Sequence, residues 1–170
     1  MRIRQTFALV PLAFFGGSVL APGADPCQAV NTTSLASYRT MLGGALASAR
    51  ADAQANGATG KYAVAATNAR DLLQRSYDRA TQMVNFYQQS TPNNTSYAEA
   101  SHIKAYLQSI LAWLPDAAHW ATISAVYHRS RRAVDAFDRA TAAIEQGGRL
   151  MAEAGNCYMA PYLAGSATPG

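Results

Sequence analysis

The sequence has only two cysteines in 170 residues, Cys27 and Cys157. So few cysteines exclude the disulfide-dense scaffolds of small secreted domains and zinc sites built from four thiolates. The absence of a Cys-x-x-Cys-His motif excludes covalently attached c-type haem. The chain also has no Gly-x-Ser-x-Gly, no His-Glu-x-x-His and no phosphate-binding glycine loop. The sequence therefore favours no particular enzymatic activity. It leaves open whether the protein is an enzyme, and the absence of these motifs favours one that is not.

Charged residues are scarce as well, at 14% of the chain, and lysine is nearly absent, with 2 lysines against 12 arginines. Two of the arginines, Arg2 and Arg4, fall in a segment that we expect to be removed. Without them 12 basic residues face 10 acidic ones, and the net charge falls from +4 to +2. So small an excess does not indicate nucleic-acid binding, and we expect no nucleic-acid partner.

The first residues have the pattern of a secretory signal peptide. Two arginines precede an apolar stretch over residues 7–20, and small residues follow it. The stretch is shorter than the roughly 18 apolar residues of a membrane span, so cleavage is favoured over a permanent anchor. We predict a signal peptide over residues 1–23, cleavage after Gly23, and a soluble mature chain that is secreted or periplasmic and has no stable membrane span.

The two cysteines of an exported chain are expected to be oxidised, because free thiols do not persist outside the cytoplasm. We therefore predict a disulfide between Cys27 and Cys157. It would close a loop of about 130 residues, for which the chain-entropy model gives about 5 kcal/mol. Two free thiols or an intermolecular bridge are the alternatives.

The apolar residues recur at helical spacing, and the alternating pattern of β-strands is absent. We expect helices over residues 33–56, 61–89 and 97–114, with Gly57 ending the first and a loop over residues 90–95 after the second. The prediction is one all-α domain over residues 24–163. It is an up-and-down four-helix bundle with a short fifth C-terminal helical segment, its two ends joined by the disulfide, and a disordered tail over residues 164–170.

Pro115 marks the expected start of the fourth helix. Proline suits the first turn of a helix, and the acid at Asp116 would complement the helix dipole there. A single helix over residues 97–146 would be about 75 Å long, too long for so small a domain. We therefore expect either a turn or a strong kink at Pro115. Gly147 and Gly148 should end the fourth helix, and the fifth segment should follow with Cys157.

Two acid–histidine pairs resemble the ligands of carboxylate-bridged di-metal bundles, in which such residues stand three apart. They are Glu99 with His102 and Asp116 with His119. A straight third helix would separate the two pairs by about 25 Å, however, and the first two helices contain no glutamate. We interpret both acids as first-turn residues that stabilise helix N-termini, and the metal content as undetermined.

The candidate ligand-binding residues are His102, Tyr106 and His119. His102 stands one turn before Tyr106, and His119 shares a helix face with Ile123 and Val126, so we expect it to be partly buried. Histidine and tyrosine can both coordinate haem iron. We predict no cofactor and keep haem as the alternative.

The outline of the chain is similar to that of small secreted haem carriers of actinobacteria. The likeness consists of the Asp25-Pro26-Cys27 start, the late cysteine and the all-helical body. It implies a haem-binding core but supplies no ligand motif in this sequence.

The densest positive cluster comprises His128, Arg129, Arg131 and Arg132. It could form a patch for an anion or an acidic partner. It could also be a solvated helix face that two following aspartates offset.

These observations predict an exported helical-bundle binding module. The expected ligand is a protein partner in the periplasm or outside the cell, because no catalytic motif is evident. A secreted haem or metal carrier that uses core histidines and tyrosines is the alternative.

Overall fold

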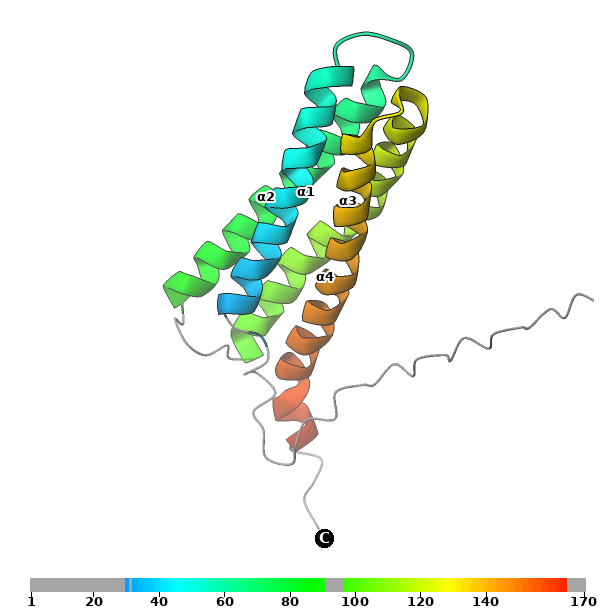
Figure 1. Ribbon diagram of the computed structural model, residues 1–170. Helices are drawn as coiled ribbons and strands as arrows, with labels where there is room; N and C mark the ends of the chain where they lie inside the picture. The colour runs from blue at the N-terminus through cyan, green and yellow to red at the C-terminus, as the bar shows by residue number, and fades with distance from the viewer. Residues whose placement is uncertain (1–29, 31, 91–96, 165–170) are drawn as a thin grey trace, which may run out of the picture.

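The computed structural model describes residues 30, 32–90 and 97–164, and within them it shows four helices and no strand (Figure 1). The helices are α1 (Thr32–Asn56), α2 (Ala63–Ser90), α3 (Tyr97–His128) and α4 (Arg131–Ala164). Each helix packs against the next in chain order, and α4 closes the bundle against α1, whereas the diagonal pair α1 and α3 barely touch. The predicted all-α four-helix bundle is confirmed.

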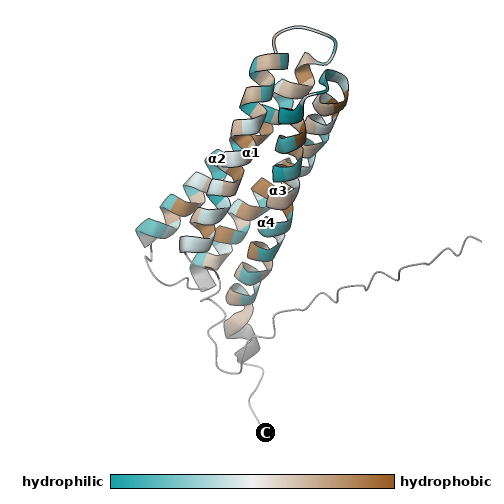
Figure 2. Ribbon diagram, viewed as in Figure 1, coloured by the Kyte–Doolittle hydropathy of each residue, from teal (hydrophilic) through white to brown (hydrophobic). Residues whose placement is uncertain are grey.

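The core is the set of apolar stripes that the helical spacing predicted. Apolar and polar residues alternate along each helix (Figure 2). On α1 the residues at helical spacing are all buried: Leu35, Tyr38, Leu42, Ala45, Leu46 and Ala49. Burial of one leucine or isoleucine contributes about 1.5–3 kcal/mol. The largest aliphatic side chains that are fully buried are Leu35, Leu42, Leu73, Met83, Ile103, Leu107, Ile110, Leu114, Leu150 and Val30.

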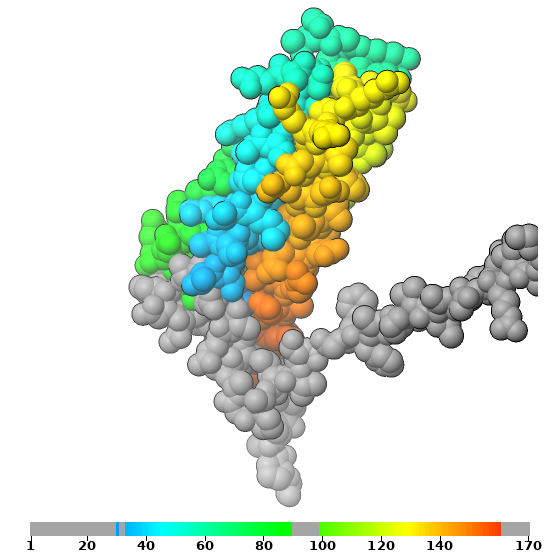
Figure 3. Space-filling view, in the orientation of Figure 1, coloured from blue at the N-terminus to red at the C-terminus, as the bar shows by residue number. Residues whose placement is uncertain are grey.

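The surface of α1 lies beside that of α4 along one side of the bundle (Figure 3). The first helix ends at Asn56, where the sequence predicted. The N–H of Gly57 makes a last helical hydrogen bond to the carbonyl of Ala53 at 2.8 Å, and the chain then turns. Gly60 in the following connection has a φ of 113°, a conformation that favours glycine.

The predicted turn at Pro115 and the predicted start of a fourth helix there are wrong, since α3 continues through this residue to His128. A strong kink at Pro115 stays a prediction. Proline removes one helical hydrogen bond and crowds the preceding turn. Here Leu114 and Ala117 are both fully buried on either side of it, so core packing holds the helix together while Pro115 faces solvent. The chain turns instead at residues 129–130, where Arg129 has a φ of 49°.

The expected end of the fourth helix at Gly147 and Gly148 is also wrong. Helix α4 runs on to Ala164, so the segment predicted as a separate fifth helix is its C-terminal part. Leu150 and Ala154 continue the buried stripe beyond the glycines, and this burial outweighs the low helix propensity of glycine.

The predicted signal peptide, Cys27, most of the predicted loop and nearly all of the predicted tail lie outside the described residues. Cys157 is fully buried on α4. Its pairing with Cys27 therefore stays a prediction. None of the four described helices combines the length and hydropathy needed to cross a membrane.

Candidate functional site

The exposed apolar side chains gather at one end of the bundle, which we call the tip. It comprises the connections 57–62 and 129–130 and the two helix turns on each side of them (Figure 1). Among the described residues six large hydrophobic side chains are exposed, and only Met159 lies far from this end. Clustering of this kind is a mark of interaction surfaces. The five at the tip are Val64, Val126, Tyr127, Val134 and Phe137.

A buried carboxylate holds the tip together. Asp52, near the end of α1, is only 2% exposed. Its oxygens accept hydrogen bonds from Ser124 Oγ at 2.6 Å, from Ser130 Oγ at 2.5 Å and from Asn56 Nδ2 at 2.8 Å. Three donors around one carboxylate compensate for its removal from water. Asp52 therefore fixes the ends of α1, α3 and α4 relative to one another.

The same network shapes the α3–α4 turn. Ser130 Oγ also accepts the N–H of Ala133 at 3.2 Å, which makes Ser130 the N-cap of α4. Arg129, in the left-handed conformation, precedes this cap. The side chain of His128 lies against the α1–α2 connection, with Nε2 at 3.2 Å from the carbonyl oxygen of Tyr62.

An aromatic pair covers the α2 side of the tip. The rings of Tyr62 and Tyr127 stack with their centroids 3.6 Å apart, and the ammonium of Lys61 lies 5.3 Å from the centre of the Tyr62 ring. A hydrogen bond with Tyr62 raises the pKa of Tyr127 above its ordinary value. Together these contacts link the two connections of the tip.

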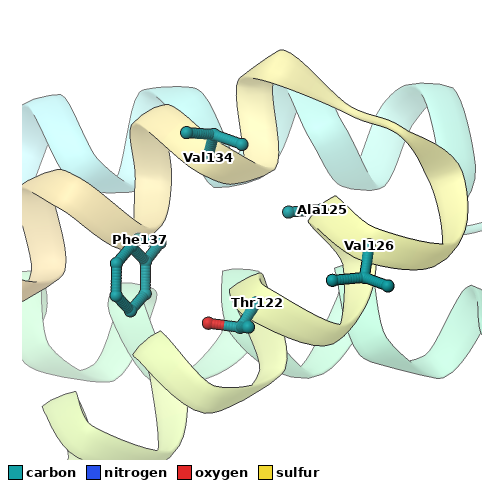
Figure 4. A pocket seen from close by; sticks show the side chains of 5 residues that line it. All are labelled: Thr122, Ala125, Val126, Val134 and Phe137. Atoms are coloured by element: carbon teal, nitrogen blue, oxygen red, sulfur yellow. The ribbon is translucent and has the colours of Figure 1, made fainter. Parts of the chain in front are cut away.

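An open apolar groove of about 290 Å³ lies between α3 and α4 (Figure 4). Val134 is 47% exposed, Val126 is 65% exposed and Phe137 is 37% exposed. In the close-up, side chains of α3 and α4 surround a shared opening. The groove is lined by Thr122, Ala125, Val126, Val134 and Phe137.

The predicted basic cluster spans the α3–α4 turn and the first turn of α4. Within the part of the chain that the structure describes, Arg129, Arg131 and Arg132 form no salt bridge. The carboxylate of Asp135, one of the two aspartates expected to offset them, accepts instead from Ser48 and from Arg139 Nε, the latter at 3.0 Å. These hydrogen bonds lower the pKa of Asp135, with the Ser48 contact the largest cause.

The candidate ligand-binding residues lie elsewhere and do not form one site. His102 is exposed, and its ring packs 5.0 Å from that of Phe86, which also lies 6.3 Å from the ring of Tyr106. The guanidinium of Arg79 stands 5.6 Å from the ring centre of Tyr106 and 5.9 Å from that of Trp113. This strip of α2 and α3 side chains holds His102 and Tyr106 by ring contacts.

The expected partial burial of His119 is wrong. The side chain is exposed and meets the ring of Trp120 at 5.7 Å, because the neighbouring Ala118 and Ala121 occupy the buried positions of this turn. His119 follows His102 by seventeen residues on the same helix, a separation of about 25 Å. The two imidazoles therefore cannot coordinate one ion.

The acids of the two acid–histidine pairs differ in position. Glu99 lies in the first turn of α3, as expected, whereas Asp116 lies in the middle of that helix and is not a first-turn acid. No group of three or more histidine, cysteine, aspartate or glutamate side chains in the described residues is arranged to hold a metal ion.

Sequence reasoning missed Asp52 and the groove. Asp52 follows the buried Ala45 and Ala49 at helical spacing, so the stripe itself contained the signal that this acid points inward. The groove depends on the α3–α4 turn, and the expected break at Pro115 hid that turn.

The chain matches no protein-family model, and comparisons with curated proteins and with solved structures find no match.

Proposed function

We propose that this protein is an exported helical-bundle binding module that engages a protein partner through its tip, in the periplasm or outside the cell. The observation that supports this most directly is that five of the six large hydrophobic side chains exposed among the described residues lie at that end. Interfaces combine an apolar centre with a polar, arginine-containing rim. The tip has this composition, with the α3–α4 groove close in sequence to Arg129 and Arg131.

The bundle supports a binding role in a second way. The Asp52 network holds the helix ends, so the tip is preorganised and little ordering entropy is lost when a partner binds. The predicted secretory leader and the predicted disulfide support a role outside the cytoplasm.

Site-directed photo-crosslinking in cells that export the chain tests the proposal. A photoreactive phenylalanine analogue replaces Val134 in the groove or, as the control, the similarly exposed Met159 far from the tip. Position 134 should yield one discrete protein adduct that position 159 does not yield. Adducts to lipid alone, or the same adduct from both positions, would contradict the proposal.

The haem-carrier alternative is tested with the purified exported protein. A Soret band, or a metal bound at one ion per chain, would favour that alternative over a protein-binding role. We expect a colourless, metal-free protein.

A further inference from the structure

The walls of the groove are almost wholly carbon. Their one polar side chain, Thr122, already donates its hydroxyl to the carbonyl of Ala118 at 3.0 Å. An extended segment in the groove would turn backbone N–H and C=O groups toward these walls and find no partner for them, which is costly. A helix satisfies its own backbone groups internally, so the groove favours a helical occupant.

The spacing of the wall residues also favours a helical occupant. Thr122 and Val126 stand four residues apart on α3, and Val134 and Phe137 stand three apart on α4. Residues at these intervals form the ridges of a helix surface, and the groove between two such ridges accepts the ridge of a third helix.

The positive charges are placed at one end of this groove. Arg131 precedes Val134 by three residues and so lies on the same side of α4, whereas Arg132 lines a separate hollow against Ala51 and Ala55 of α1. Arg129 occupies the turn between the two helices. Guanidinium groups without a carboxylate partner are suited to bidentate pairing with acidic side chains.

Resting on the function proposed above, we infer that the bound segment is an amphipathic α-helix. Its apolar stripe occupies the α3–α4 groove, and acidic residues at one of its ends pair with Arg129 and Arg131. A second copy of the chain that docked by the same face would bring identical arginines together, and nucleic acid would gain nothing from a carbon-lined groove.

Peptide binding measured by fluorescence anisotropy tests this inference. The probe is a synthetic amphipathic peptide of about 18 residues, long enough to be helical, with a leucine stripe and glutamates at one end. Two matched peptides carry lysine in place of the glutamates or a central proline. Binding to vesicles of anionic phospholipid tests whether a membrane surface occupies the groove. Sedimentation of the protein alone tests whether a second copy of the chain does.

We expect the acidic peptide to bind at least about tenfold more tightly than the lysine peptide, since one charged hydrogen bond is worth about that factor. It should exceed the proline peptide by at least as much, because a proline inside a helix costs about 3 kcal/mol. Val134→Asp and Arg131→Glu should each weaken it about tenfold, while Met159→Asp and Arg75→Glu, their controls outside the tip, should not. Arg131→Glu should also improve binding of the lysine peptide.

Equal binding of the acidic and lysine peptides, binding of none of them, tighter capture by vesicles, or self-association through the groove would each overturn the inference. If crosslinking from position 134 still captures one protein, only the inference that the bound segment is an acidic amphipathic helix is refuted, and the proposed function stands. If both experiments fail, the binding function fails as well.

Discussion

The hydroxyl of Ser124 in α3 donates a 2.6 Å hydrogen bond to the carboxylate of Asp52 in α1, and both side chains are buried. Through Ser130 the same carboxylate reaches the N-cap of α4. One acid thus ties three helices together next to the apolar groove. The surface that we propose for binding is therefore supported by a polar network inside the bundle.

Replacement of Asp52 should be strongly destabilising. Asp52→Ala leaves the hydroxyls of Ser124 and Ser130 without their acceptor, and each unsatisfied buried donor costs about 1–3 kcal/mol. We expect a loss of about 2–4 kcal/mol in the free energy of unfolding, measured by urea denaturation. Asp71→Ala, at an exposed acid on α2, should change it by less than about 0.5 kcal/mol, and equal effects would refute the role of Asp52.

The adjacent glycines of α4 should respond oppositely to alanine. A Cβ on Gly147 would lie 2.5 Å from Tyr38 Oη and 2.9 Å from Leu111 Cδ2, whereas one on Gly148 meets nothing within 4 Å. Overpacking costs about 1–3 kcal/mol, so Gly147→Ala should destabilise the fold. Gly148→Ala should stabilise it by about 0.5–1 kcal/mol through helix propensity alone. Melting temperatures of the two variants check this, and a shift of the same sign in both would contradict it.

Tyr38 should make the fold sensitive to alkaline pH. Burial raises the pKa of Tyr38 above its ordinary value of 10.0, and its hydroxyl has no hydrogen-bond partner among the described residues. Because the unfolded chain releases this proton first, the stabilising contribution is complete below about pH 10 and declines as the pH rises further. Tyr38→Phe should reduce the loss of stability above pH 10 and should not destabilise the protein at pH 7. A pH series of urea denaturations measures both, and an unchanged alkaline slope would count against the prediction.

Arg131 and Arg132 occupy the first turn of α4, where the helix dipole favours acids and no acid is present. Arg131→Glu and Arg132→Glu should therefore each raise the free energy of unfolding by about 0.3–1 kcal/mol at low salt, and less at high salt. Arg75→Glu, inside α2, should bring no such gain. A stabilised variant that no longer binds would separate the role of the arginines in binding from any role in folding, while destabilised variants would refute the dipole argument.

The predicted bridge between Cys27 and Cys157 has a direct test. Mass spectrometry of the exported protein under non-reducing conditions should find the two cysteines in one linked pair of peptides. The complete burial of Cys157 fits a structural role for its sulfur. Free thiols, or a linkage between two chains, would exclude the internal bridge.

Part of the site was accessible from the sequence. The basic cluster was visible in the sequence as a run of positive residues. Knowing that the chain turns at residues 129–130 was enough to place this cluster at a helix end. Pro115 was the misleading signal, since its local preference for a helix start was outweighed by the buried residues on either side of it. Once the turn is assigned to residues 129–130, Val126, Val134 and Phe137 become exposed neighbours.

The sequence by itself determined the helical class and the apolar stripes, because these follow from residue periodicity along a single helix. Only the tertiary structure decided where the long helices end, that Asp52 is paired across the bundle, and that unpaired apolar and basic side chains meet at one end. Those features depend on contacts between residues far apart in the chain, and such contacts can outweigh the local preferences of proline and glycine.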